Sequence, residues 1–166
     1  MGCRAKFWLA SASLVTVAGL SVAGFAGCGG DDGDEGLSTE EFIAKADAIC
    51  EKADKEQAAP QGKDGRGAYG ESFSDPAFLS SFNAATKDAL KQLRALDAPE
   101  SERKALGELL SAVEGSIAAI DNQIAALRAK DPPKQSEANR DWIRRYGDIQ
   151  ASAAALGLTQ CQTLGN

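Results

Sequence analysis

The sequence predicts an all-α protein, an antiparallel up-down four-helix bundle that follows a signal peptide and a flexible tether. Three observations predict this fold. The chain contains a long seven-residue apolar repeat, capping and proline signals divide it into four helical segments, and no stretch shows sustained period-two alternation rich in β-branched residues. A length of 166 residues suits one domain, and four helices with short connections are expected to cross at about 20°.

The first 27 residues have the organisation of an export signal. Arg4 and Lys6 form a positive start, and the 21 residues from Phe7 to Gly27 carry no charge. A short positive segment followed by an apolar run and small residues is typical of a secretory signal. We therefore expect residues 1–27 to be a signal peptide and the body of the protein to lie outside the cytoplasm.

This signal ends in Phe25-Ala26-Gly27-Cys28, where the chain resembles the bacterial lipoproteins. In that family an apolar and two small residues precede an invariant cysteine, which receives acyl chains such as palmitate before signal peptidase II cuts in front of it. Ala26 and Gly27 match the small positions, while Phe25 stands where leucine is commonest. The resemblance implies that Cys28 is lipidated and holds the protein on the extracytoplasmic face of the cell membrane.

Three alternatives to this processing remain open. The 21 uncharged residues are long enough to stay in the membrane as an uncleaved anchor. A plain cut after Ala23 would instead release the protein. The start Met1-Gly2-Cys3 suggests N-myristoylation, but Lys6 stands where that motif needs Ser or Thr.

Residues 28–36 are predicted to be the lipidated cysteine and an acidic, glycine-rich tether. Gly29 to Gly36 contain four carboxylates and no apolar side chain, and the spacing of an EF-hand is absent.

Without residues 1–27 the chain carries 16 basic and 24 acidic side chains, a net charge of −8. Such a surface repels nucleic acid and anionic lipid, so we expect no nucleic-acid partner and membrane attachment only through the acyl chains.

Residues 37–166 are predicted to form the helical bundle domain. The first helix opens with a capping box over residues 38–41, Leu37 is placed to pack on Phe42, and Pro60 ends the helix. Its apolar face contains Phe42, Ala46, Ile49, Cys50 and Ala53.

The segment 60–74 is predicted to be the one long loop. Its glycines suggest a phosphate-binding loop, but Gly62-Lys63 is followed by Asp64 where Ser or Thr is required, and no strand precedes it. Aromatic side chains in such a loop pack on the bundle or contact a partner, and for Tyr69 and Phe73 we expect the former.

The second helix is predicted to begin at Asp75-Pro76 and to end at Ala98-Pro99. Its buried face is expected to contain Phe78, Phe82, Ala85, Ala89, Leu93 and Leu96.

The third helix carries the clearest signal in the chain. Glu100 and Glu102 are expected to open it, and Pro132-Pro133 to end it. A heptad repeat runs through Leu106, Leu110, Val113, Ile117, Ile120, Ile124 and Leu127. We interpret this repeat as the core of the bundle in a monomer, the alternative being a seam shared with another chain.

The fourth helix repeats the same spacing and is predicted to stop at Gly157, with Leu158 behind it in a Schellman-like end. Its apolar face contains Trp142, Tyr146, Ile149, Ala153 and Leu156.

The four cysteines are predicted to have three different fates. Cys3 is lost with the signal, Cys28 becomes the anchor, and two thiols remain in an oxidising compartment. A disulfide between Cys50 and Cys161 would close a loop of 112 residues. A redox-active pair is the alternative, but no C-x-x-C spacing supports it.

The composition excludes several kinds of chemistry. The chain has no histidine and its only methionine is Met1, which excludes Ser-His-Asp and Cys-His catalysis and His-ligated metals or haem. We therefore expect no metal and no cofactor. The carboxylates of the first helix are interpreted as a solvated face: Glu40, Glu41, Asp47, Glu51 and Asp54.

Arginines flank Trp142 on the fourth helix and could hold an anionic ligand: Arg140, Arg144 and Arg145. Acidic side chains stand three or four residues away, at Glu137, Asp141 and Asp148. Because such spacing favours pairing along the helix, a solvated charged face is the preferred interpretation.

Across nearly its whole length the chain resembles the small helical lipoproteins of high-GC Gram-positive bacteria. The resemblance rests on Gly-Cys-Gly-Gly-Asp-Asp at 27–32, Ala-Asp-Ala-Ile-Cys at 46–50, Leu-Asp-Ala-Pro at 96–99, and Leu-Gly-Leu at 156–158 before Cys161. This group has no established activity, so the resemblance assigns no functional residues.

The expected function is that of a membrane-anchored, non-enzymatic binding or interaction module of the cell envelope. Its partner would be another envelope protein, cell-wall material or a small ligand. One alternative is a small-ligand binder in the bundle core, between Phe78, Phe82 and Trp142. The other is a carboxylate-based cell-wall hydrolase, with Glu51 as the residue to mutate.

Overall fold

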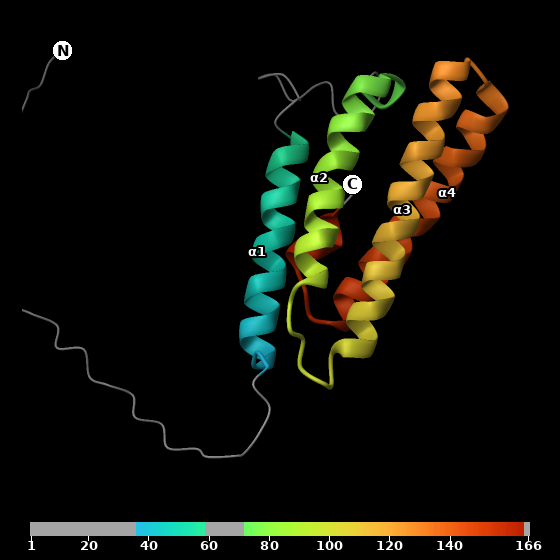
Figure 1. Cartoon of the computed structure of the whole chain (residues 1–166). Coiled ribbons are helices and arrows are strands. Elements are labelled where there is room, and N and C mark those ends of the chain that lie inside the picture. Colours follow the sequence, from blue (N-terminus) through green and yellow to red (C-terminus); the bar gives the residue numbers. More distant parts are fainter. Residues whose placement is uncertain (1–35, 59–71, 165–166) are drawn as a thin grey trace, which may run out of the picture. The chain divides into compact units, whose positions relative to one another are not determined.

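The computed structural model describes residues 36–58 and 72–164, which form an all-α bundle of four long helices (Figure 1). These are α1 (Thr39–Ala58), α2 (Pro76–Arg94), α3 (Arg103–Ala129) and α4 (Pro132–Ala155), with 3₁₀ segments η1 (Ser72–Ser74) and η2 (Gln160–Thr163). Consecutive helices run in opposite directions, and no strand occurs in the described residues (Figure 1). The predicted fold class is therefore confirmed. The predicted signal peptide, Cys28, most of the tether, and Tyr69 lie outside the described residues.

The start of α1 follows the predicted capping box. The Ser38 backbone N–H donates to Glu41 Oε2 at 3.1 Å, and the Glu41 N–H donates to Ser38 Oγ at 3.3 Å. Both bonds satisfy donors that a helix start otherwise leaves unpaired. Leu37 is partly buried against the core cluster that contains Phe42.

The start of α2 is also as predicted, because Asp75 Oδ1 accepts from the Ala77 N–H at 2.8 Å and Pro76 is the first helical residue. Its end differs from the prediction. The helix stops at Arg94, and Leu96 packs partly buried from the connection that follows. The proline at 99 disfavours helical geometry only at the residue before it, so it did not mark the true end.

The start of α3 also differs from the prediction. The helix begins at Arg103, and the Pro99 carbonyl accepts from the N–H groups of Glu102 and Arg103 in the turn before it. Glu102 occupies the N-cap position, yet its side chain makes no capping bond. Acidic residues near a helix start are favourable to its dipole but do not locate the first residue.

The connection between α3 and α4 consists of Lys130 and Asp131 alone. Lys130 has φ +53°, and its backbone N–H donates to Leu127 O. The Asp131 N–H donates to Ala126 O at 3.0 Å, so α3 ends in a Schellman arrangement. The two prolines expected to break the third helix are instead the first residues of α4. Asp131 caps that helix by accepting from the Lys134 N–H.

The end of α4 confirms the predicted stop. Gly157 has φ +71° and donates to Ala154 O, and the Leu158 N–H donates to Ala153 O at 2.9 Å. Leu158 is fully buried. The chain therefore turns back toward α1 directly after the helix.

The heptad repeat of α3 lies in the core. Five of its seven positions are buried, while Leu110 and Leu127 are partly buried. The buried face is wider than a heptad seam because α3 packs against both α2 and α4. The extra buried residues are Leu109, Ala112, Ser116, Ala119, Gln123 and Ala126.

The buried residues form two clusters. The larger one joins all four helices and the C-terminal segment, around Phe42, Leu109 and Ile149. The second contains Phe78 and Phe82 with residues of α3, and Phe73, Leu127 and Trp142 pack on it. None of the described helices combines the length and apolar character needed to cross a membrane.

The predicted disulfide is present. Cys50 on α1 and Cys161 in η2 are bonded, with Cα atoms 5.0 Å apart and both side chains fully buried. The bridge holds the C-terminal segment between α1 and α4, so η2 contacts both helices.

Candidate functional site

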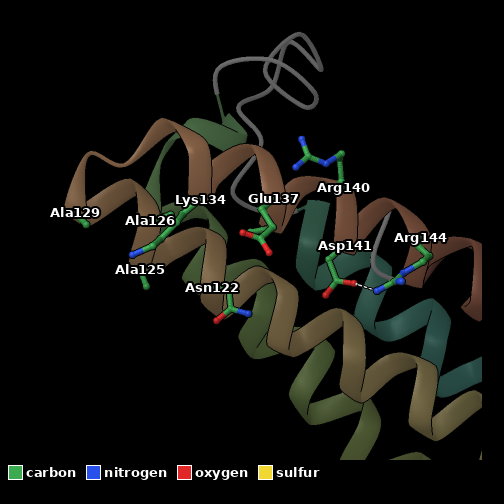
Figure 2. Close-up of a pocket in the computed structure, with 10 residues that line it drawn as sticks. Asn122, Ala125, Ala126, Ala129, Lys134, Glu137, Arg140, Asp141 and Arg144 are labelled. Atoms are coloured by element: carbon green, nitrogen blue, oxygen red, sulfur yellow. Dashed lines mark hydrogen bonds and ion pairs between the residues drawn. The ribbon is translucent and has the colours of Figure 1, made fainter.

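A groove lies between the C-terminal half of α3 and the N-terminal half of α4 (Figure 2). It has a volume of about 820 Å³. Alanines form much of its lining, at positions 125, 126 and 129 on α3 and 138 on α4. Because alanine has little bulk, the two helices leave room between them for another molecule.

The charges of the groove come from α4. Glu137 and Asp141 point toward α3, where Asn122 lies across the groove, whereas Arg140 points away from α3 (Figure 2). Asp141 pairs with Arg144, and Glu137 and Arg140 make no ion pair with other described residues. The groove thus offers a carboxylate inside and a guanidinium at its rim.

Of the three arginines that could hold an anionic ligand, Arg140 and Arg144 line the groove and Arg145 does not. Arg144 is paired with Asp141, and Arg145 lies within 3.8 Å of Asp141 and 3.9 Å of Asp148. The preferred interpretation, pairing along the helix, holds for these two residues. Arg140 alone is left facing outward.

Arg145 lies across α3 at a glycine. A Cβ at Gly115 would stand 2.8 Å from Arg145 Nε, so the position of the arginine depends on the missing side chain. Its Nε is buried and has no hydrogen-bond partner among the described residues. Arg145 does not line the groove of Figure 2, and it lines instead a smaller depression between α3 and α4, together with Gly107 and Asp148.

The core position proposed for a small ligand is filled by the protein itself. Phe73 lies with its ring centroid 5.1 Å from Trp142, 5.7 Å from Phe78 and 5.8 Å from Phe82. The prediction that Phe73 packs on the bundle is confirmed.

Two polar atoms in this region have no partner among the described residues. They are the Trp142 Nε1 donor and the Gln123 Oε1 acceptor, and both are buried. An unpaired buried donor or acceptor costs about 1–3 kcal/mol. Most buried polar atoms in proteins have at least one hydrogen-bond partner.

The acidic face of α1 is only partly the solvated surface that we predicted. Glu51 pairs with Lys55 at 2.6 Å, as expected. Asp47 and Asp54 instead accept hydrogen bonds from the C-terminal segment, with Thr159, Gln160 and Thr163 as donors. Sequence spacing along α1 could not reveal these bonds, because the donors come from a segment more than 100 residues away.

Hydrogen bonds, a neighbouring charge and burial shift the pKa values of carboxyl groups at Glu41, Asp88 and Asp54. Hydrogen bonds from Ser38 hold the pKa of Glu41 below its ordinary value, and the ammonium of Lys52 does the same for Asp88. Burial raises the pKa of Asp54, against the opposing effect of the Thr163 hydroxyl bond. Asp54 lies beneath the C-terminal segment, so its shift has a structural cause.

Metal-binding side chains are not clustered in the described part of the chain: no three Cys, Asp or Glu residues stand close enough to share an ion. Comparisons with protein-family models, curated proteins and solved structures return no match to this chain.

Proposed function

We propose that this chain is a lipid-anchored bacterial envelope protein whose bundle is a non-enzymatic binding module. The lipoprotein-like sequence around Cys28 supports the anchor, and the buried Cys50–Cys161 disulfide supports an oxidising, extracytoplasmic location. The acidic tether would hold the bundle away from the membrane surface.

The observation that carries the binding role is the place of the groove relative to the tether. The Leu37 N–H donates to Asp97 O, so the tether joins the bundle at the end where α2 turns into α3. The groove begins at Asn122, 19 residues into α3, which is about 28 Å along the helix. The groove therefore lies at the opposite end of α3 from the point where the tether joins the bundle.

The lining indicates a polar partner. The free carboxylate of Glu137 can accept from N–H groups, and Arg140 at the rim can donate to a carboxylate. An extended peptide segment of another envelope protein carries both kinds of group, and the alanine lining leaves room for its backbone. We propose such a segment as the partner.

Two matched pairs of variants test this function in a Gram-positive host. Cys28→Ala should abolish the acylated mass and move the protein out of the membrane fraction, while Cys3→Ala should change neither in the mature protein.

A photo-crosslinking residue at Ala125 should form a reproducible crosslink that Glu137→Lys reduces. The same residue at the exposed Ser81 on α2 should form none. Equal crosslinking from both positions would contradict the groove as the binding surface.

A small-ligand binder in the bundle core is the second candidate, favoured by the unpaired polar atoms near Phe73.

We do not propose the hydrolase alternative. It needs two carboxylates facing each other across a cleft, and Glu51 is exposed and paired with Lys55.

A further inference from the structure

Phe73 differs in origin from the side chains around it. It comes from η1, a three-residue segment, whereas its neighbours Phe78, Phe82 and Trp142 come from α2 and α4. The walls of this site therefore belong to the helical framework, while the ring that fills it belongs to a short connecting segment.

Few contacts to the framework hold Phe73. Its carbonyl accepts from Gln123 Nε2 at 3.2 Å, and its ring makes edge or tilted contacts with three aromatic neighbours. The ring is only partly buried, unlike those of Phe78 and Phe82.

The site carries polar groups that Phe73 does not use. Gln123 is 7% exposed, and its Oε1 belongs to the same amide that bonds to the Phe73 carbonyl. Trp142 Nε1 belongs to the ring closest to Phe73. One unpaired acceptor and one unpaired donor are thus buried on two side chains that contact Phe73.

We propose that Phe73 occupies a ligand site in its own protein, and that the ligand is a flat aromatic molecule with one hydrogen-bond acceptor and one donor. The ring of such a molecule would replace the Phe73 ring between Trp142, Phe78 and Phe82. Its acceptor would pair with Trp142 Nε1 and its donor with Gln123 Oε1. This inference names the ligand class for the second candidate function and is independent of the lipid anchor.

The test uses the full chain in lipid nanodiscs and 2-quinolinone, a bicyclic lactam with one C=O and one N–H, as the probe. Binding is followed by calorimetry and ligand-observed NMR, with empty nanodiscs subtracted. Phe73→Ala should bind the probe roughly tenfold or more tightly than the unmodified chain, because no ring has to be displaced. Ile143→Ala, at an exposed position of α4, should bind as the unmodified chain does.

The polar groups are tested in the Phe73→Ala background. Trp142→Phe keeps a ring but removes the donor, and should weaken binding of 2-quinolinone several-fold while binding of naphthalene stays unchanged. Gln123→Leu should likewise weaken binding of 2-quinolinone, because it removes the acceptor.

Circular dichroism and the intact Cys50–Cys161 mass show whether each variant is folded. Folded Phe73→Ala that binds no probe would overturn the proposal, as would equal weakening of lactam and naphthalene by Trp142→Phe. If Phe73→Ala does not fold, Phe73→Leu provides the same comparison with a smaller side chain at the site. None of these results depends on Cys28, so failure here and failure of membrane anchoring are distinguishable.

Discussion

Asp47 on α1 and Thr159 after α4 are joined by two hydrogen bonds, although 112 positions separate them. Asp47 Oδ2 accepts from the Thr159 N–H at 3.2 Å and from its hydroxyl at 3.0 Å, and Oδ1 accepts from the Gln160 N–H at 2.9 Å. The carboxylate thus caps the start of η2 from a neighbouring helix. Together with the disulfide one turn further along α1, it attaches the C-terminal segment to α1.

Asp47→Ala should therefore lower the free energy of unfolding by about 1–3 kcal/mol, because two backbone N–H donors lose a charged acceptor. Urea unfolding followed by circular dichroism measures the change. Glu51→Gln on the same helix is the control and should change stability by less than about 0.5 kcal/mol, since its pair with Lys55 is exposed. Equal effects of the two variants would contradict a capping role for Asp47.

The paired Cys50→Ala and Cys161→Ala variant should lose up to about 4.7 kcal/mol of stability, the value expected for a closed loop of about 100 residues. The bridge acts by limiting the conformations of the unfolded chain, so the fold itself should persist. Chemical denaturation with and without reductant provides the measurement, and reductant should have no effect on the variant. A loss below about 1 kcal/mol would contradict this entropic account of the bridge.

Asp54→Asn should stabilise the protein more at pH 7 than at pH 3. Burial raises the pKa of Asp54 above its ordinary value of 3.8, so the folded chain binds its proton more tightly than the unfolded chain. The stability that this group contributes is present at low pH and is lost as pH rises from about 3.8 through the folded pKa. Asparagine resembles the protonated form and still accepts from Thr163.

Unfolding of this variant and of the original chain across pH 3–7 measures that difference. Ile143→Ala, an exposed change that involves no titratable group, is the control and should not alter the pH dependence. A constant difference between the Asp54→Asn variant and the original chain at all pH values would contradict the raised pKa.

The two interior glycines of α3 should respond differently to alanine. Gly107→Ala should add about 0.5–1 kcal/mol of stability, because a Cβ there meets nothing within 4 Å. At Gly115 the new Cβ would stand 2.8 Å from Arg145 Nε, so Arg145 must move and the gain should be smaller or reversed. Thermal or urea unfolding of both variants gives the comparison. Equal gains would mean that Arg145 has an equally good position elsewhere.

The sequence was sufficient to predict that the segments are helices. It was not always sufficient to predict the residues at which the helices begin and end. Three ends marked by a side-chain cap or by glycine at positive φ were predicted correctly, at Ser38, Asp75 and Gly157. The start of α4 also has a side-chain cap, at Asp131, but its prolines were interpreted as the end of the third helix. The ends at Arg94, Arg103 and Lys130 have no such residue-specific signal. Lys130 adopts the left-handed conformation that usually falls to glycine, because the two-residue connection to α4 requires it.

The candidate sites were less predictable than the fold. The groove depends on which alanines of α3 face α4, and heptad spacing marks only the buried side of a helix. The sequence identified Phe78, Phe82 and Trp142 as the aromatic residues of a possible core site. It did not predict that Phe73 would fill the space between them. A helical period identifies a face and says nothing of what packs against that face.

By itself, the sequence determined the number of helices, their order, most of their buried faces and the pairing of Cys50 with Cys161, because periodicity, capping and cysteine count are local or compositional properties. Only the tertiary structure decided which side chains meet across helices: Asp47 with Thr159, Arg145 with Gly115, and Phe73 with Trp142. Those contacts depend on the rotation and offset of packed helices, which many sequences with the same periodicity would set differently.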